Sequence, residues 1–194
     1  MRATRLSPSP NGASTRLRSC ARADKHQPAM IRGSDPGQEQ SGTRVLQPFG
    51  LIPHVGAAVL LDEIRDTGQG DRLSATVLVR PGTAFSSADG SLPGWVGVEI
   101  LAQLVAAFAT LASSEPAGPA RVGLLTGVRM YRCRPDNFSP GTLLEAGIVE
   151  AMTDGSGIGV FDGTLTSAGE VVAEGILTAY RLDDPEAFLR GVLS

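Results

Sequence analysis

The stretch LPGWVGVEILAQLVAAFATLAS, residues 92–113, decides how this chain of 194 residues folds. Its middle is apolar on nearly every face of a helix, so the periodicity predicts a helix that protein surrounds on most sides. Pro93 and Gly94 precede the helical pattern and set its start. The apolar residues concerned are Ile100, Leu101, Ala102, Leu104, Val105, Ala106, Ala107, Phe108, Ala109 and Ala112. The rest of the chain must therefore supply the surface that covers this helix.

Two polar residues interrupt the apolar helix. Glu99 and Gln103 are four positions apart, which places their side chains on one face near the helix N-terminus. An ionisable group in apolar surroundings costs free energy unless it is paired or used in chemistry. Glu99 is therefore the first candidate for a catalytic residue, and the alternative is a structural carboxylate bonded to a backbone donor or an arginine.

Charge is distributed unevenly along the chain. Residues 1–44 hold eight Lys and Arg against three Asp and Glu, whereas residues 45–194 hold nine against seventeen, a net charge of -8. Phosphate binding needs a clustered positive surface, so this acidic body argues against nucleic acid as a partner. The length accommodates one domain with a tail.

The sequence offers few ligands for metals or disulfides. Cys20 lies in the tail and Cys133 in a strand-like run, and the two histidines are His26 and His54. These residues form neither a disulfide framework nor a CxxC motif, so we expect no metal site. No phosphate loop or dinucleotide fingerprint stands between a strand and a helix, so we expect no bound cofactor.

Residues 1–44 have the composition of a disordered N-terminal extension, and 45–194 form the folded domain. The extension is rich in Arg, Ser, Pro and Gly and shows no apolar period. Its Arg content matches an organellar transit peptide, but it lacks the amphipathic face, so we interpret it as an incidental extension with Met30 as an alternative start. The central helix is too short and polar for a membrane span, and we expect a cytoplasmic protein.

The segments around the central helix have strand patterns separated by turns. Residues 72–80, RLSATVLVR, alternate apolar and polar side chains, as half-buried strands do. Other strands are predicted at 59–64, 121–133, 142–152, 157–165 and 170–180, with turns at 154–156 and 167–169. A short helix is predicted after Asp184-Pro185. One long helix with two strands before it and four after it predicts an α+β domain, a curved antiparallel β-sheet wrapped around the helix, which is the hotdog fold. Its free edge strand favours a homodimer or a hetero-oligomer with another hotdog protein.

Two motifs resemble those of β-hydroxyacyl-acyl-carrier-protein dehydratases, a hotdog family. IPHVG at 52–56, leading into LLD at 60–62, resembles their LPHRGPMLLLD opening. LPGWVGVEILAQ at 92–103 resembles their helix motif that ends in Glu-x-x-Ala-Gln. The pattern of Trp95 and Gly97, with GLLTGVR at 123–129 and FDG at 161–163, is most similar to the dehydratase-like subfamily of aryl polyene biosynthesis.

The sequence departs from these enzymes before the helix. Better-known fatty-acid dehydratases have a Gly-His-Phe-Pro-Gly segment there, whereas residues 84–90 contain no histidine. His54 is therefore the only imidazole of the body that can pair with Glu99. Val55 also replaces the usual arginine of the opening motif.

The resemblance implies dehydration of 3-hydroxyacyl thioesters to trans-2-enoyl thioesters in fatty-acid or polyene-type biosynthesis. His54 is suited to removing the proton α to the carbonyl, and Glu99 to protonating the departing hydroxyl. The first-turn N–H groups around Val96 and Gly97 would hold the enolate oxygen. Gly94 and Gly97 would let the thioester approach the backbone closely.

The remaining candidates each have a structural alternative. Gln103 would orient Glu99 or line the acyl tunnel, and a structural role is favoured. His54 taken alone is also compatible with a polar residue that caps the first strand. Trp95 and Phe108 are expected to fill the core rather than stack on a ligand.

A positive cluster is predicted around one strand end, at Arg129, Arg132 and Arg134. We expect it to contact the phosphopantetheine phosphate or the acidic surface of an acyl-carrier protein, and the alternative is a solvated face. The substrate would then be carried on the phosphopantetheine of the acyl-carrier protein.

Two other functions remain open. A hotdog acyl thioesterase would use Glu99 to activate water. A non-catalytic hotdog subunit would support a partner dehydratase, which the missing histidine before the helix favours.

Overall fold

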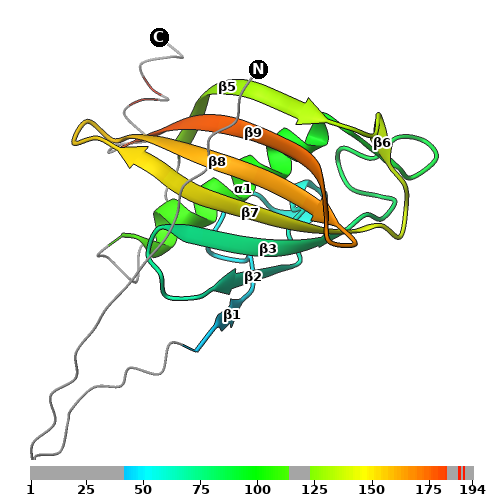
Figure 1. Ribbon diagram of the computed structural model, residues 1–194, viewed down its shortest axis with the longest axis horizontal. Coiled ribbons are helices and arrows are strands. Elements are labelled where there is room, and N and C mark those ends of the chain that lie inside the picture. The colour runs from blue at the N-terminus through cyan, green and yellow to red at the C-terminus, as the bar shows by residue number, and fades with distance from the viewer. Residues whose placement is uncertain (1–41, 114–122, 183–187, 189, 191–194) are drawn as a thin grey trace, which may run out of the picture. The chain divides into compact units, whose positions relative to one another are not determined.

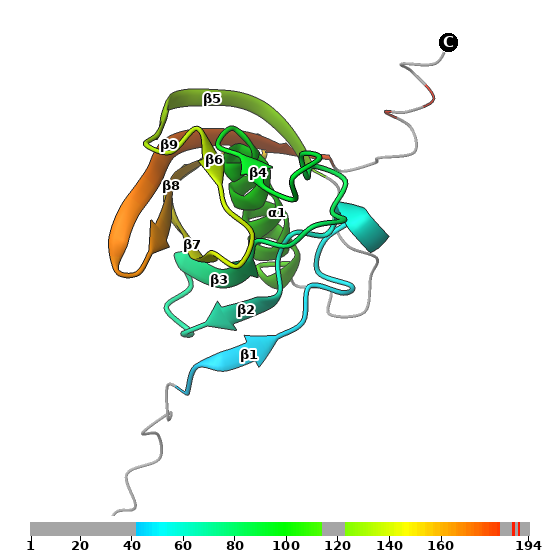
Figure 2. The same cartoon turned by 90° about the vertical axis from the view of Figure 1, so that its right-hand side faces the viewer.

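The computed structural model describes residues 42–113, 123–182, 188 and 190. Seven strands form one antiparallel sheet in the order β1-β2-β3-β7-β8-β9-β5, and the helix α1 (Val96–Leu111) lies against its concave face (Figure 1). The sheet strands are β1 (Arg44–Leu46), β2 (Glu63–Asp66), β3 (Arg72–Leu78), β5 (Gly123–Cys133), β7 (Leu143–Thr153), β8 (Ile158–Ser167) and β9 (Glu170–Arg181). Figure 2 shows the sheet curving around α1. The predicted α+β hotdog fold is confirmed.

The central helix is covered along its whole length. Every residue of α1 is buried or half-buried, as its sequence predicts. Leu101 and Leu104 are fully buried and pack in one core with Leu165 and Leu177 of the sheet. A Cβ added to Gly163 would lie 2.8 Å from Leu101 Cδ1, so this glycine of β8 lets the helix approach the sheet closely. Each such leucine contributes roughly 1.5–3 kcal/mol of burial free energy.

The helix begins after Pro93 and Gly94, as predicted, but the strand that precedes it was not predicted. Leu92–Pro93 form a short strand, β4, which pairs with β6 (Asn137–Phe138), and α1 begins at Val96. Gly94 N–H also donates to Asp136 O at 2.6 Å, which extends this backbone contact to the residue after β4. Chain segments on both sides of the helix in sequence therefore meet at its N-terminus.

The first predicted strand also begins later than expected. A 3-10 turn, η1 (Gly56–Ala58), comes first, and β2 starts at Glu63. Leu60 N–H donates to the side chain of Gln103 instead of to a neighbouring strand, which keeps this segment out of the sheet. The β1 strand was not predicted, because three residues show no usable period.

Two predicted turns are confirmed in the hairpins of the sheet. Ala168 (φ 50°) and Gly169 (φ 83°) make the β8–β9 turn, and Asp154 makes the β7–β8 turn by accepting the N–H groups of Ser156 and Ile158 at 3.0 Å each. The predicted helix after Asp184-Pro185 and residues 1–41 of the predicted extension lie outside the described residues, Phe188 and Arg190 excepted. Among the described residues, no helix is long and apolar enough to span a membrane.

Candidate active site

An imidazole and a carboxylate from distant parts of the chain meet beside the first turn of α1. His54 lies in the loop before η1, and its Nε2 is 3.1 Å from Glu99 Oε1. A contact of this length requires one proton, which either the imidazole donates to the carboxylate or the carboxylic acid donates to the imidazole. The side chains are 31% and 27% exposed, so a ligand can reach both. The structure thus brings together, in one chain, the two residues that the sequence paired.

The side-chain amide of Gln103 holds the carboxylate of this pair in place. It is completely buried, and its Nε2 donates to Glu99 Oε1 at 3.0 Å and to Ala58 O at 2.8 Å. Its Oε1 accepts the N–H of Leu60 at 3.0 Å. One amide therefore orients Glu99 and joins the loop that follows His54 to α1, in line with the structural role favoured from the sequence.

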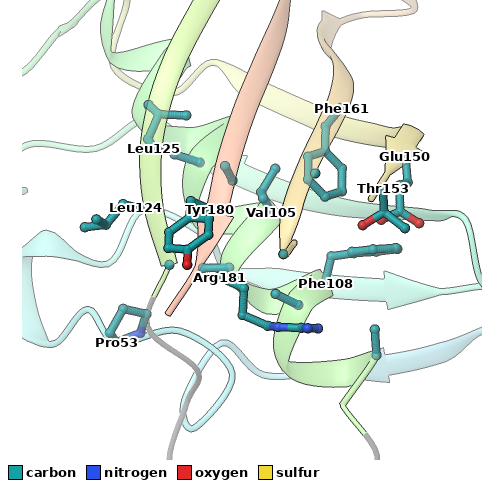
Figure 3. A pocket seen from close by; sticks show the side chains of 18 of the residues that line it. Pro53, Val105, Phe108, Leu124, Leu125, Glu150, Thr153, Phe161, Tyr180 and Arg181 are labelled. Carbon is teal, nitrogen blue, oxygen red and sulfur yellow. The ribbon is translucent and has the colours of Figure 1, made fainter. Parts of the chain in front are cut away.

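The pair lines a cavity of about 490 Å³ that runs along α1. Figure 3 shows Val105 and Phe108 of α1 among the residues that line it. Such a volume is in the range of about 300–1,000 Å³ that is usual for small-molecule sites. The wall of the cavity on α1 consists mainly of small residues. The ring of Phe108 on this wall meets that of Phe161 of β8 edge to face, with centroids 5.5 Å apart. The lining residues from α1 are Glu99, Ala102, Val105, Ala106, Phe108 and Ala109. This stripe, extended by Ala112, covers about 20 Å at 1.5 Å per residue.

The opposite wall of the cavity comes from the ends of four strands, β5, β7, β8 and β9. Leu124 and Leu125 are at the start of β5, and Tyr180 and Arg181 are at the end of β9. Glu150 of β7 adds a half-buried carboxylate, so charged groups line the cavity beyond its apolar middle. Leu124 and Leu125 belong to the quoted motif at 123–129, but nothing in the sequence marked Glu150, Tyr180 or Arg181 as site residues, because strand ends that are remote in sequence converge only in the folded sheet.

The start of the helix is arranged differently from the expected oxyanion site. Val96 and Gly97 are buried and are not among the described residues that line the cavity. Gly97 N–H donates to Gly94 O at 3.2 Å. A Cβ on Gly94 would lie 2.6 Å from Pro135 O, and one on Gly97 would collide with the Tyr131 hydroxyl. Protein atoms thus occupy the space that the sequence analysis reserved for a thioester, and substrate binding by these residues stays a prediction.

The two aromatic residues of the helix segment have different environments. Phe108 is buried in the core, as predicted. Trp95 is 61% exposed, so the prediction that it fills the core is wrong. It precedes the first helical turn, and its ring meets that of Phe85 edge to face with centroids 6.4 Å apart.

Comparison with known proteins places this geometry in a family. A family model described as ApeP dehydratase, ApeP-like, matches residues 46–190. The chain belongs to the ApeP-like dehydratase family. Among curated proteins, no sequence matches the chain.

Several solved structures are similar to this ApeP-like chain. The dehydratase heterocomplex ApeI:P from Xenorhabdus doucetiae matches with a TM-score of 0.68 and 25% identity, covering 78% of this chain and 100% of that one. The PaaI protein of the E. coli phenylacetic acid degradation operon matches with a TM-score of 0.46 and 12% identity, covering 64% of this chain and 78% of that one. A hypothetical thioesterase from Streptococcus pneumoniae, solved with coenzyme A, has a TM-score of 0.44 and 12% identity, with 57% and 81% covered.

The predicted arginine cluster of this ApeP-like chain lies on the edge strand β5 and just after it. Arg129, Arg132 and Arg134 are all exposed, and Arg132 Nη1 is 3.6 Å from Glu174 Oε1. Their neighbour Tyr131 contacts Gly94, so the cluster is at the same end of α1 as Glu99. In the described residues, no group of three or more His, Cys, Asp or Glu side chains is arranged to hold a metal ion.

Proposed function

We propose that this chain catalyses the dehydration of 3-hydroxyacyl thioesters, carried on an acyl-carrier protein, to trans-2-enoyl thioesters. The observation that carries the proposal is the contact of 3.1 Å between His54 Nε2 and Glu99 Oε1 at one end of an apolar cavity. Membership of the ApeP-like dehydratase family supports the class of reaction.

In the proposed reaction the substrate enters between the imidazole and the carboxyl group. Neutral His54 takes the C2 proton through Nε2, and the electrons of the C2–H bond form the enolate of the thioester. The enolate collapses to the C2=C3 double bond as the C3–O bond breaks, and protonated Glu99 donates its proton to the departing hydroxyl, which leaves as water. The imidazolium and the carboxylate then stand in contact, so direct transfer of one proton from His54 to Glu99 restores the starting state.

The surroundings of the pair suit this chemistry. Gln103 holds Glu99 Oε1 in a fixed position before substrate binds, which reduces the reorganisation that the reaction requires. The apolar cavity receives the acyl chain, since its α1 wall of alanines leaves room for a narrow hydrocarbon.

The carrier protein is proposed to dock near the arginine cluster. Acyl-carrier proteins present an acidic surface and a phosphate, and Arg129, Arg132 and Arg134 are exposed cations on an otherwise acidic body. Because the cluster shares one end of α1 with Glu99, a pantetheine arm that enters there reaches the pair first. The acyl chain then continues along α1.

We also propose that the chain works in a complex with another hotdog protein. The similar Xenorhabdus structure is described as the heterocomplex ApeI:P. The sheet ends at β5, and this edge strand exposes Leu125, Val128 and Met130, which a second sheet would cover. A homodimer through the same edge is the alternative, and light scattering of the chain alone and mixed with its partner distinguishes them.

The deciding experiment is mass spectrometry of a 3-hydroxyacyl-carrier protein incubated with this chain, alone and with a partner hotdog protein. We expect loss of water from the carrier-bound acyl group, abolished by His54→Gln and by Glu99→Gln in folded protein. Release of free carrier thiol would instead indicate a thioesterase. Turnover with the partner that survives both substitutions would assign the chemistry to the partner and make this chain a supporting subunit.

A further inference from the structure

Tyr131 of the edge strand reaches across to the start of α1. Its hydroxyl donates a hydrogen bond to Gly94 O at 2.6 Å, two residues before the helix begins. Resting on the proposed function, we infer that Tyr131 is a positioning residue, whose hydroxyl fixes the first turn of α1 and thereby the carboxylate of Glu99 relative to His54.

A bulge in β5 directs the tyrosine inward. Arg129 pairs with Ile176 of β9 and Arg132 pairs with Glu174, so β5 contains one residue more than β9 between these pairs. Met130 lies in the bulge, and its φ of 53° is unusual for a residue other than glycine. Such a bulge shifts the alternation of side chains, and here it places Tyr131 on the helix side while Arg132 stays exposed.

Two glycines make the room that the ring needs. A Cβ added to Gly97 of α1 would collide with the Tyr131 hydroxyl, and one added to Gly175 of β9 would lie 3.0 Å from Tyr131 Cδ2. The ring thus fills a slot between helix and sheet whose width depends on the absence of both side chains. This slot is present although neither glycine needs a positive φ.

The hydroxyl acts at a helix start that has no side-chain cap. The residue before α1, Trp95, provides no side-chain cap for the free N–H groups of the first turn. Gly97 N–H turns back to Gly94 O at 3.2 Å, the same oxygen that accepts the tyrosine hydrogen bond. The Tyr131 hydroxyl and the Gly97 N–H therefore donate to the same carbonyl oxygen, that of Gly94.

The position of the Gly94 carbonyl affects where Glu99 lies, because Glu99 stands in the first turn of α1, which follows directly. Gln103 holds the carboxylate from the second turn, whereas Tyr131 anchors the backbone that precedes it. His54 belongs to a different segment, so a displaced first turn changes its distance from Glu99. Burial raises the pKa of the Tyr131 phenol, which keeps the hydroxyl protonated as a donor.

The test compares Tyr131→Phe with Thr126→Val. Both remove a hydroxyl of β5 that donates to a backbone carbonyl, but Thr126 Oγ1 donates to Thr178 O of the neighbouring strand β9 at 3.1 Å, whereas Tyr131 donates to Gly94 O ahead of α1. Two readouts do not require activity: amide exchange at Gly97 and Val98, and the rate at which diethylpyrocarbonate modifies His54, with His26 in the same chain as the reference. A third readout is dehydration of a 3-hydroxyacyl-pantetheine.

We expect Tyr131→Phe to speed amide exchange at Gly97 and Val98 by roughly fivefold, the equivalent of one hydrogen bond. The exchange rate of the Leu104 amide should not change. In Tyr131→Phe, the rate at which His54 is modified should approach the rate measured in a Glu99→Ala variant, in which His54 has lost its partner. The kcat of Tyr131→Phe should fall by roughly tenfold or more with little change in KM. Thr126→Val should leave amide exchange, the His54 modification rate and the dehydration rate at wild-type values.

A lower melting temperature without any change in amide exchange or His54 reactivity would overturn the inference and leave Tyr131 a purely structural residue. If Tyr131→Phe did not fold, Gly97→Ala would displace the same hydroxyl from the helix side, and unchanged His54 reactivity in that variant would also overturn it. An inactive wild-type chain would refute the proposed function, but the exchange and modification rates would still decide the role of Tyr131.

Discussion

The side-chain amide of Gln103 donates to Glu99 Oε1, the same oxygen that lies 3.1 Å from His54 Nε2. That oxygen is therefore shared between a fixed, buried donor and a partly exposed imidazole. Glu99 is held on one side while its other side remains available to substrate. Changes at any of these three residues should affect turnover, but through different steps.

Gln103→Glu should reduce both stability and turnover. A glutamate keeps the shape and the acceptor for Leu60 N–H, but it cannot donate to Ala58 O or Glu99, and it places two carboxyl groups side by side. Each buried group left without a partner costs about 1–3 kcal/mol. Thermal unfolding and steady-state kinetics measure the two effects; an unchanged melting temperature would contradict the role given to Gln103.

Substitutions of His54 and Glu99 should be strongly non-additive. We expect His54→Gln and Glu99→Gln each to lower kcat by about 10²–10⁴-fold, the usual contribution of a general acid or base. The double variant should lose little beyond either single one, because the base and the acid act as one unit in the same reaction. Rates that multiply across the double-mutant cycle would indicate that the residues act independently.

Ala106→Phe should make the enzyme selective for short acyl chains. Ala106 lines the middle of the cavity wall on α1, and a ring there blocks the path beyond the His54–Glu99 pair. We expect kcat/KM for long 3-hydroxyacyl substrates to fall by roughly tenfold or more, with short substrates much less affected. Ala151→Phe, at an exposed position of β7, is the matched control. Equal losses for all chain lengths would place the acyl chain elsewhere.

Reversing the charge of Arg129 and Arg134 should weaken recognition of the carrier protein alone. The double substitution to Glu is expected to raise KM for the carrier-bound substrate and to reduce its dependence on salt, while the free pantetheine thioester is turned over normally. Arg65→Glu with Arg72→Glu, on β2 and β3, is the control for net charge. If both pairs act alike, the cluster is a solvated face.

Gly97→Ala should destabilise the fold much more than Gly147→Ala. The added methyl meets the Tyr131 hydroxyl and would lie 2.8 Å from Leu165 Cδ1, whereas at Gly147 the nearest atom is Thr164 Oγ1 at 3.4 Å. Overpacking of this kind costs about 1–3 kcal/mol. Chemical denaturation of the two variants measures the difference, and similar values would show that the slot around Tyr131 adapts.

The sequence was informative about elements whose pattern is local. The helix, the long strands and two hairpin turns follow from periodicity and turn residues within each segment, and the apolar surroundings of Glu99 marked it as a site residue. Trp95 shows the limit of this reasoning. Its aromatic side chain favours a core position, but β4 pairs with β6 and the helix starts only at Val96, which leaves the indole outside the core.

The sequence by itself determined that one apolar helix is wrapped by a sheet, and that an imidazole, a carboxylate and an amide are the polar groups available beside it. Only the tertiary structure decided that His54 meets Glu99, that strand ends complete the cavity, and that Tyr131 reaches Gly94. The physical reason is that periodicity reports which face of an element is buried, whereas contacts between elements depend on strand register, a single bulge and the glycines that admit a ring.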